Sequence, residues 1–329
     1  MTDPGEIKNV TASVHQRLLN WAKAHSAVFD LVLQRYAAER FLYRLGASSE
    51  VDRFTLKGAL LFLVWSGSEF RATRDVDLLG TGAEDHAAIH EAMTAICVIE
   101  DPRDGLAFDL SRIRVEEIRL DQGYGAVRVK LEARLGKAKI SLQVDIGFGD
   151  TIHPAREEAD YPTLLDHAAP RIWIYPRETV IAEKFEAMVR LGAVNSRMKD
   201  FWDVAALSQE FEFDGETLRT AIDETFRRRG TPISEMVPAA LLPAFYQDEK
   251  RAEMWRTFRQ KPGLQLKVPA AFAAAGERVI AFLGPVRESL ARDEGFARVW
   301  QKGGPWRTGY GEEDVERMAT AKDEGRLSL

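Results

Sequence analysis

The chain has 329 residues, enough for one large domain or two. Hydrophobic residues make up 45% and charged residues 29%, a balance that excludes a wholly disordered protein. A net charge of -6 argues against an extensive basic surface for nucleic acid, and a single cysteine, Cys97, excludes a disulfide framework or a multi-thiolate zinc site.

Neither a targeting segment nor a membrane span is predicted. Residues 1–9 are polar and lack the basic-then-apolar order of a signal peptide. The longest apolar stretch, residues 58–65, is too short to cross a bilayer. We therefore expect a cytoplasmic protein without membrane contact.

The N-terminal region is predicted to be helical. Apolar side chains recur every three to four positions across residues 11–46, and Gly46 with Ser48 and Ser49 predicts a stop. We expect an N-terminal helical segment over residues 1–48.

Strands and helices mix in the next part of the chain. Strand-like alternation occurs in residues 54–58, 73–79, 125–131 and 139–146, and helical spacing in residues 59–65 and 84–98. The mixture predicts an α/β (α+β) fold, in which a small mixed β-sheet is flanked by helices. We place this core at residues 49–165.

The rest of the chain is predominantly helical. After a strand-like segment at residues 171–175, helical spacing covers residues 176–192, 196–211, 216–229 and 248–260. The Lys261-Pro262-Gly263 break ends this region, and beyond about residue 283 the chain is glycine-rich and charged. We expect a helical domain over residues 166–262 and a partly flexible extension over residues 263–329.

Asp75 and Asp77 form the first pattern that points to chemistry. Residues two apart on a strand face the same side, so both carboxylates are expected side by side. Like charges this close repel unless a cation lies between them, and magnesium prefers hard oxygen ligands. The same pattern is also common at surfaces and in turns.

Asp145 supplies a third acid. It lies in an almost uninterrupted apolar strand, residues 140–148, where a carboxylate is costly unless it is paired or bound to metal. Three acids on two adjacent strands would hold two magnesium ions, one at the attacking hydroxyl and one at the leaving phosphates. Asp75, Asp77 and Asp145 are the predicted metal ligands.

Gly58 and Lys184 are further candidates. Gly58 stands between a predicted strand and a predicted helix, where glycine lets the backbone approach phosphate oxygens or simply makes a tight turn.

Lys184 is centred on an apolar helix stripe, so its ammonium needs a partner: a triphosphate, an internal acid such as Asp200 or Asp203, or water reached by snorkelling. The two aspartates are also candidates for orienting the nucleotide or the acceptor hydroxyl.

The motifs together resemble a known superfamily. Lys57-Gly58-Ala59, residues 71–77 and Val144-Asp145-Ile146 are similar to the DNA polymerase β-like nucleotidyltransferases. More narrowly, residues 178–184, 197–203 and 255–258 resemble the AbiEii/AbiGii toxin family. The resemblance covers roughly residues 15–260.

This resemblance implies transfer of NMP from an NTP to an acceptor hydroxyl, with the 3′ end of tRNA the expected acceptor. It implies the toxin of an AbiE-like (type IV) toxin–antitoxin or phage-defence system, with a separately encoded AbiEi-like antitoxin and no stable complex required. The nucleotide-binding residues it implies are Lys57, Gly58, Ala59, Arg74 and Lys184. Ala59 departs from the superfamily, which commonly has a hydroxyl there, so backbone N–H groups and Lys57 would contact phosphate instead.

Two alternatives stay open at this point. The same chemistry could modify a protein hydroxyl or a small molecule, which the acidic composition mildly favours. The chain could also be a catalytically inactive nucleotide-binding module, a reading that the missing hydroxyl at Ala59 permits. The three acids speak against inactivity.

Overall fold

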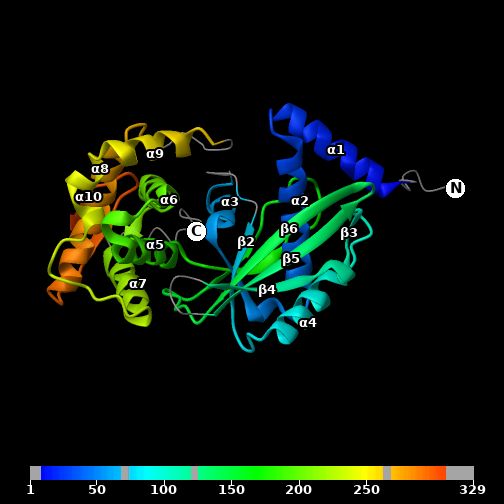
Figure 1. Cartoon of the computed structure of the whole chain (residues 1–329), viewed down its shortest axis with the longest axis horizontal. Helices are drawn as coiled ribbons and strands as arrows, with labels where there is room; N and C mark the ends of the chain where they lie inside the picture. The colour runs from blue at the N-terminus through cyan, green and yellow to red at the C-terminus, as the bar shows by residue number, and fades with distance from the viewer. Residues whose placement is uncertain (1–8, 68–72, 74, 120–124, 262–267, 309–329) are drawn as a thin grey trace, which may run out of the picture. The chain divides into compact units, whose positions relative to one another are not determined.

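The computed structural model describes residues 9–67, 73, 75–119, 125–261 and 268–308 (Figure 1). The described chain divides into two compact units, the first ending at Pro176 and the second beginning at Arg177. Helices and strands mix in the first unit, while helices dominate the second. The predicted α/β (α+β) class, with a mainly helical C-terminal region, is therefore confirmed.

The first unit is built on one mixed β-sheet. Its strands are β1 (Phe54–Lys57), β2 (Asp75–Gly80), β3 (Leu106–Phe108), β4 (Arg114–Arg119), β5 (Gly125–Leu135), β6 (Ala138–Phe148), β7 (Glu157–Asp160) and β8 (Arg171–Ile174). Their order is β3-β5-β6-β2-β1-β8-β7, and β4 also pairs with β5. The β2–β6 and β1–β8 pairs are parallel and the others antiparallel.

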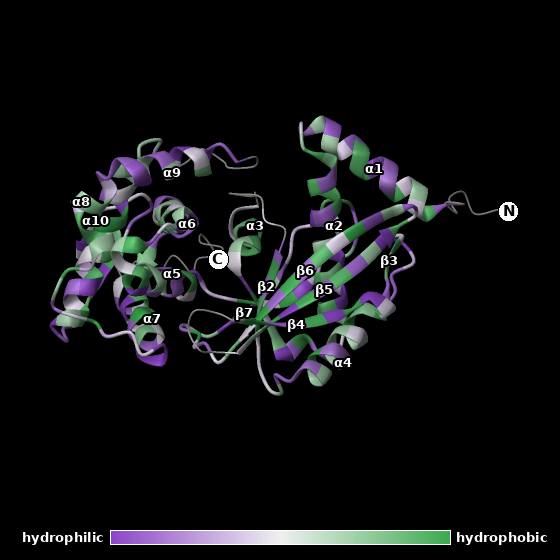
Figure 2. Ribbon diagram, viewed as in Figure 1, coloured by the Kyte–Doolittle hydropathy of each residue, from purple (hydrophilic) through white to green (hydrophobic). Residues whose placement is uncertain are grey.

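The helices of the first unit share an apolar core with this sheet. They are α1 (Val10–Ala24), α2 (Phe29–Ala47), α3 (Leu61–Ser66) and α4 (His86–Cys97). Helix α2 packs against β6 and β8, and α4 packs against α2 and β4. The sheet presents buried apolar residues in register to this core, among them Leu56, Leu78 and Ile146. Figure 2 shows hydrophobic and hydrophilic residues alternating along β5 and β6, which leaves the polar side chains on the opposite face.

The structure adds detail to two helical predictions in this unit. The helices expected over residues 11–46 are α1 and α2, and the chain turns between them at Ser26, whose φ is +50°. The helix expected over residues 59–65 begins as a 3-10 turn, Gly58–Leu60, before α3. In both places the apolar spacing continued through a change in backbone direction that periodicity does not detect.

The second unit is a helical bundle with a small sheet. Its helices are α5 (Arg177–Leu191), α6 (Met198–Glu210), α7 (Gly215–Arg228), α8 (Pro243–Tyr246), α9 (Glu249–Arg259) and α10 (Phe272–Ala291). Strand β10 (Arg298–Trp300) lies between β9 (Phe213–Asp214) and β11 (Trp306–Thr308). Helix α10 packs against α6 and α7, so the region after residue 263 contributes to the core of this unit. No regular element had been predicted there.

Among the described helices, none combines the length and the apolar character needed to cross a membrane.

Candidate active site

Four charged residues lie in one row across the polar face of the sheet. Strand register pairs Lys57 with Asp77, Asp77 with Asp145, and Asp145 with Arg128, on β1, β2, β6 and β5 respectively. Asp75 lies two residues before Asp77 and therefore shares its face. The fold thus brings the three predicted acids onto neighbouring strands of one surface, as their spacing predicted.

Gly58 lies directly against Asp77. Its φ of +78° is in the left-handed region, which side chains other than hydrogen rarely allow. A Cβ built on Gly58 would lie 2.8 Å from Cγ and 2.9 Å from Cβ of Asp77. The turn between β1 and α3 therefore closes over the Asp77 carboxylate. This contact was not predicted from sequence.

The carboxylate of Asp145 is held by two side chains. Arg128 donates from Nε to Oδ1 at 2.9 Å and from Nη2 to Oδ2 at 2.8 Å, a two-pronged pairing. Gln143 adds a hydrogen bond from Nε2 to Oδ2 at 3.2 Å. The hydrogen bond to Asp145 raises the pKa of Arg128, and the negative charges of Asp75 and Glu116 add to the effect.

Sequence analysis missed Arg128, although the chain carries a signal for it. Strands β5 and β6 form a hairpin in which Leu135 pairs with Ala138, so only Gly136 and Lys137 form the loop. Gly136 has a φ of +62°, as a tight hairpin turn requires. Counting back from this turn places Arg128 opposite Asp145.

Lys57 and Ala59 have other local roles. The Lys57 ammonium donates to Asp150 Oδ2 at 2.9 Å and lies 5.6 Å from the centroid of the Tyr175 ring. Ala59 is buried in the core. Their proposed contacts with phosphate stay predictions. Arg74, another predicted nucleotide contact, lies outside the described residues.

The donor chemistry of this face suits a hard cation, with one condition. Asp75 and Asp77 are half-buried and place carboxylate oxygens on the same face. Asp145 could turn toward a cation the lone pairs that now accept from Arg128 only by giving up that pairing. Among the described residues, no group of three carboxylate, histidine or cysteine side chains is already gathered as a metal site.

Lys184 lies in the second unit, within a buried ion-pair cluster. Its ammonium is 2.6 Å from Asp203 Oδ2 and 3.2 Å from Asp200 Oδ1. Both aspartates are almost fully buried, and Arg197 Nε lies 2.9 Å from the other oxygen of Asp200. Of the readings left open from sequence, the internal ion pair is the one present here, and it involves both aspartates. A contact with nucleotide stays a prediction.

Comparison with known proteins shows the family of this chain. The model of the AbiEii toxin family, nucleotidyl transferases of type IV toxin–antitoxin systems, matches residues 40–278. The chain belongs to the AbiEii family. It is therefore a nucleotidyltransferase, and the match spans both the charged sheet face and the Lys184 cluster.

Other comparisons add little to the AbiEii assignment. JHP933 from Helicobacter pylori is 13% identical with a TM-score of 0.42, covering 77% of this chain and 90% of its own. A second H. pylori structure, described provisionally as a nucleotidyltransferase, has the same identity and TM-score and covers 78% and 94%. No curated protein matches the chain.

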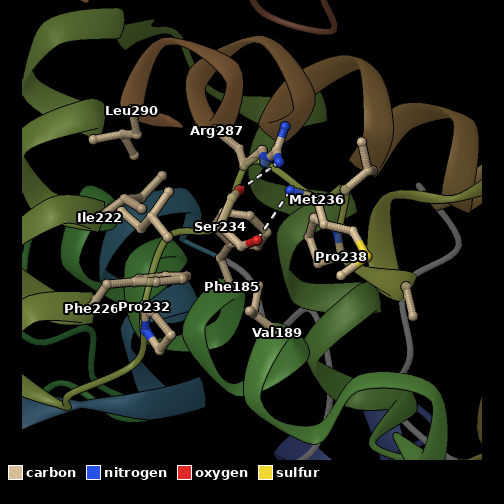
Figure 3. Close-up of a pocket in the computed structure, with 13 residues that line it drawn as sticks. Phe185, Val189, Ile222, Phe226, Pro232, Ser234, Met236, Pro238, Arg287 and Leu290 are labelled. Carbon is tan, nitrogen blue, oxygen red and sulfur yellow. Dashed lines mark hydrogen bonds between the residues drawn. The ribbon is translucent and has the colours of Figure 1, made fainter. Parts of the chain in front are cut away.

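The second unit of this AbiEii protein also contains an apolar cavity of about 290 Å³ (Figure 3). The rings of Phe185 and Phe226 line it, and Arg287 Nη2 is fixed by the carbonyl oxygens of Ser234 at 2.6 Å and Glu235 at 2.5 Å. The described lining residues include no carboxylate, histidine or cysteine. The cavity is therefore not the place where the predicted acids gather.

Proposed function

We propose that this AbiEii protein is a metal-dependent enzyme that transfers NMP from an NTP to the 3′ end of tRNA, and that it acts as a toxin in this way. The observation that carries the proposal is the sheet face on which Asp75, Asp77 and Asp145 occupy neighbouring strands while Gly58 closes over Asp77. Two adjacent carboxylates on a rigid sheet, with backbone closely applied to one of them, suit a cation that carries a polyphosphate.

Each residue has a proposed task. Asp75 and Asp77 would hold two magnesium ions, which would neutralise charge on the phosphates and lower the pKa of the acceptor hydroxyl. Asp145 would bind at the acceptor side and help remove the hydroxyl proton. The oxygen of the hydroxyl then forms a bond to the α-phosphorus while the bond to the pyrophosphate oxygen breaks, so NMP is transferred and pyrophosphate leaves.

The proposed partners follow from the family and from this chemistry. The substrates would be an NTP and an RNA acceptor, and the antitoxin would be a separately encoded AbiEi-like protein, with phage defence as the setting. Because the antitoxin need not form a stable complex, we expect it to restore growth without co-purifying with the toxin.

The experiment incubates the full-length protein with magnesium, total tRNA, total protein and each of four α-labelled NTPs. The proposal predicts label in tRNA with one or more NTPs, and none with Asp75→Asn. Label in protein or in a small molecule would show that the acceptor is not tRNA, while the transfer of NMP would stand. Tight NTP binding with no labelled product would favour an inactive nucleotide-binding module and contradict the proposal.

A further inference from the structure

Arg128 has no role in the proposed reaction, although it contacts one of the proposed metal ligands. Its Nε and Nη2 both donate to Asp145, one of the three acids of the proposed site. Arg128 is in register with Glu116 on its other side, and the charge of Asp75 also acts on it. Its guanidinium thus lies within the acidic centre, where the arriving triphosphate would also bind.

This pairing opposes the binding of a lone cation. A cation that displaces Arg128 from Asp145 leaves a guanidinium without its anion beside a new positive charge. The Arg128 and Asp145 side chains keep 33% and 21% of their surface exposed, so both have room to change partner. An anion arriving with the cation would remove the conflict, and the planar fork of arginine matches phosphate as well as carboxylate.

We propose that Arg128 is a nucleotide-binding residue that exchanges Asp145 for a phosphate of the NTP. Asp145 correspondingly exchanges the guanidinium for the cation. The inference rests on the proposed function above and deepens it, because the exchange makes metal and nucleotide bind together rather than separately. No covalent bond changes in this step.

Lys130 provides a matched control. It lies two residues along β5 from Arg128 and therefore on the same face, and its ammonium pairs with Glu116 at 2.8 Å rather than with Asp145. Lys130→Gln removes the same charge from this face as Arg128→Gln. A second variant, Arg128→Lys, keeps the charge and loses the fork, so it separates the pairing from simple electrostatics.

The test measures binding of Mn²⁺ to the full-length protein, by electron paramagnetic resonance, with and without α,β-methylene analogues of the four NTPs. Without nucleotide, Arg128→Gln should bind Mn²⁺ about tenfold more tightly than wild type, and Arg128→Lys should show a smaller tightening because it keeps the charge. Lys130→Gln should change affinity by less than about threefold. The gain in Mn²⁺ affinity on adding the analogue should be smaller in both Arg128 variants than in wild type. Thermal unfolding of each variant verifies that it is folded.

The outcomes separate this inference from the proposed function. Equal tightening by Arg128→Gln and Lys130→Gln, or no tightening by Arg128→Lys, would overturn the exchange while leaving the metal site intact. Mn²⁺ binding that is absent from wild type and Arg128→Gln alike, with or without an analogue, would overturn the metal-dependent function as well.

Discussion

The backbone of Gly58 lies so close to Asp77 that a larger residue at position 58 would have to displace the aspartate side chain. A Cβ there would lie 2.8 Å from Cγ and 2.9 Å from Cβ of the aspartate, and the φ of +78° independently favours glycine. The turn after β1 and the acid on β2 therefore fix each other. In the proposed site, this contact sets where the Asp77 carboxylate can hold a cation.

Gly58→Ala is expected to displace Asp77 and to reduce NMP transfer by about 100-fold, since catalytic groups tolerate little displacement. Gly67→Ala is the control, because Gly67 has a φ of +67° and a Cβ there would meet no described atom within 4 Å. Both variants carry backbone strain, but only the first touches Asp77. Transfer rates alongside thermal unfolding test this, and equal losses in the two variants would contradict it.

Lys184→Met is expected to lower the free energy of unfolding by about 3–5 kcal/mol, because it leaves the buried Asp200 and Asp203 without their ammonium partner. Lys184→Arg, which keeps the charge, should retain more of that stability. Urea unfolding measures both variants. If Lys184→Met were as stable as wild type and yet inactive, the ammonium would serve the substrate rather than the ion-pair cluster.

Glu39 is expected to make stability depend on pH. It is fully buried in α2, where it accepts a hydrogen bond from the N–H of Leu164 at 2.6 Å, and burial raises its pKa from 4.5 to about 7. The folded state thus binds a proton that the unfolded state releases between these values, so stability falls as pH rises from about 4.5 to 7.

Glu39→Gln should lack this part of the pH dependence. Relative to wild type, the variant should gain up to about 3 kcal/mol in unfolding free energy between pH 4.5 and pH 8. Urea unfolding at several pH values measures how the difference in unfolding free energy between the two proteins changes with pH. An effect of the amide that is the same at every pH does not alter this change. Parallel curves for the two proteins would show that the Glu39 carboxyl keeps an ordinary pKa.

Alternation along the chain was sufficient to predict the central strands and the face that bears the acids. Val76 and Leu78 are buried in the core, so Asp75 and Asp77 had to face the other way. Periodicity contains no information about strand order, and so the Arg128–Asp145 pair required the hairpin register. The close contact of Gly58 with Asp77 likewise depends on β1 pairing with β2, a contact distant in sequence.

Helix α10 and the strands after it were not predicted, for a different reason. Pro285 and the neighbouring glycines lower the helical propensity of residues 272–291, yet Phe282 and other apolar residues of α10 are buried against the bundle. Tertiary packing outweighed local propensity there. The short strands β10 and β11 depend on Trp300 and Trp306, which pack on Phe282 from a distance in sequence.

The most direct test of the account compares Asp77→Asn with Glu116→Gln in transfer of labelled NMP to tRNA. Both substitutions neutralise one acid on the same row of the sheet. Glu116 lies at the end of that row on β4, where it pairs with Lys130 and not with a proposed metal ligand. We predict that Asp77→Asn loses transfer by at least about 1,000-fold while Glu116→Gln stays within about threefold of wild type. Transfer that survives in Asp77→Asn would contradict the assignment of this face as the catalytic centre.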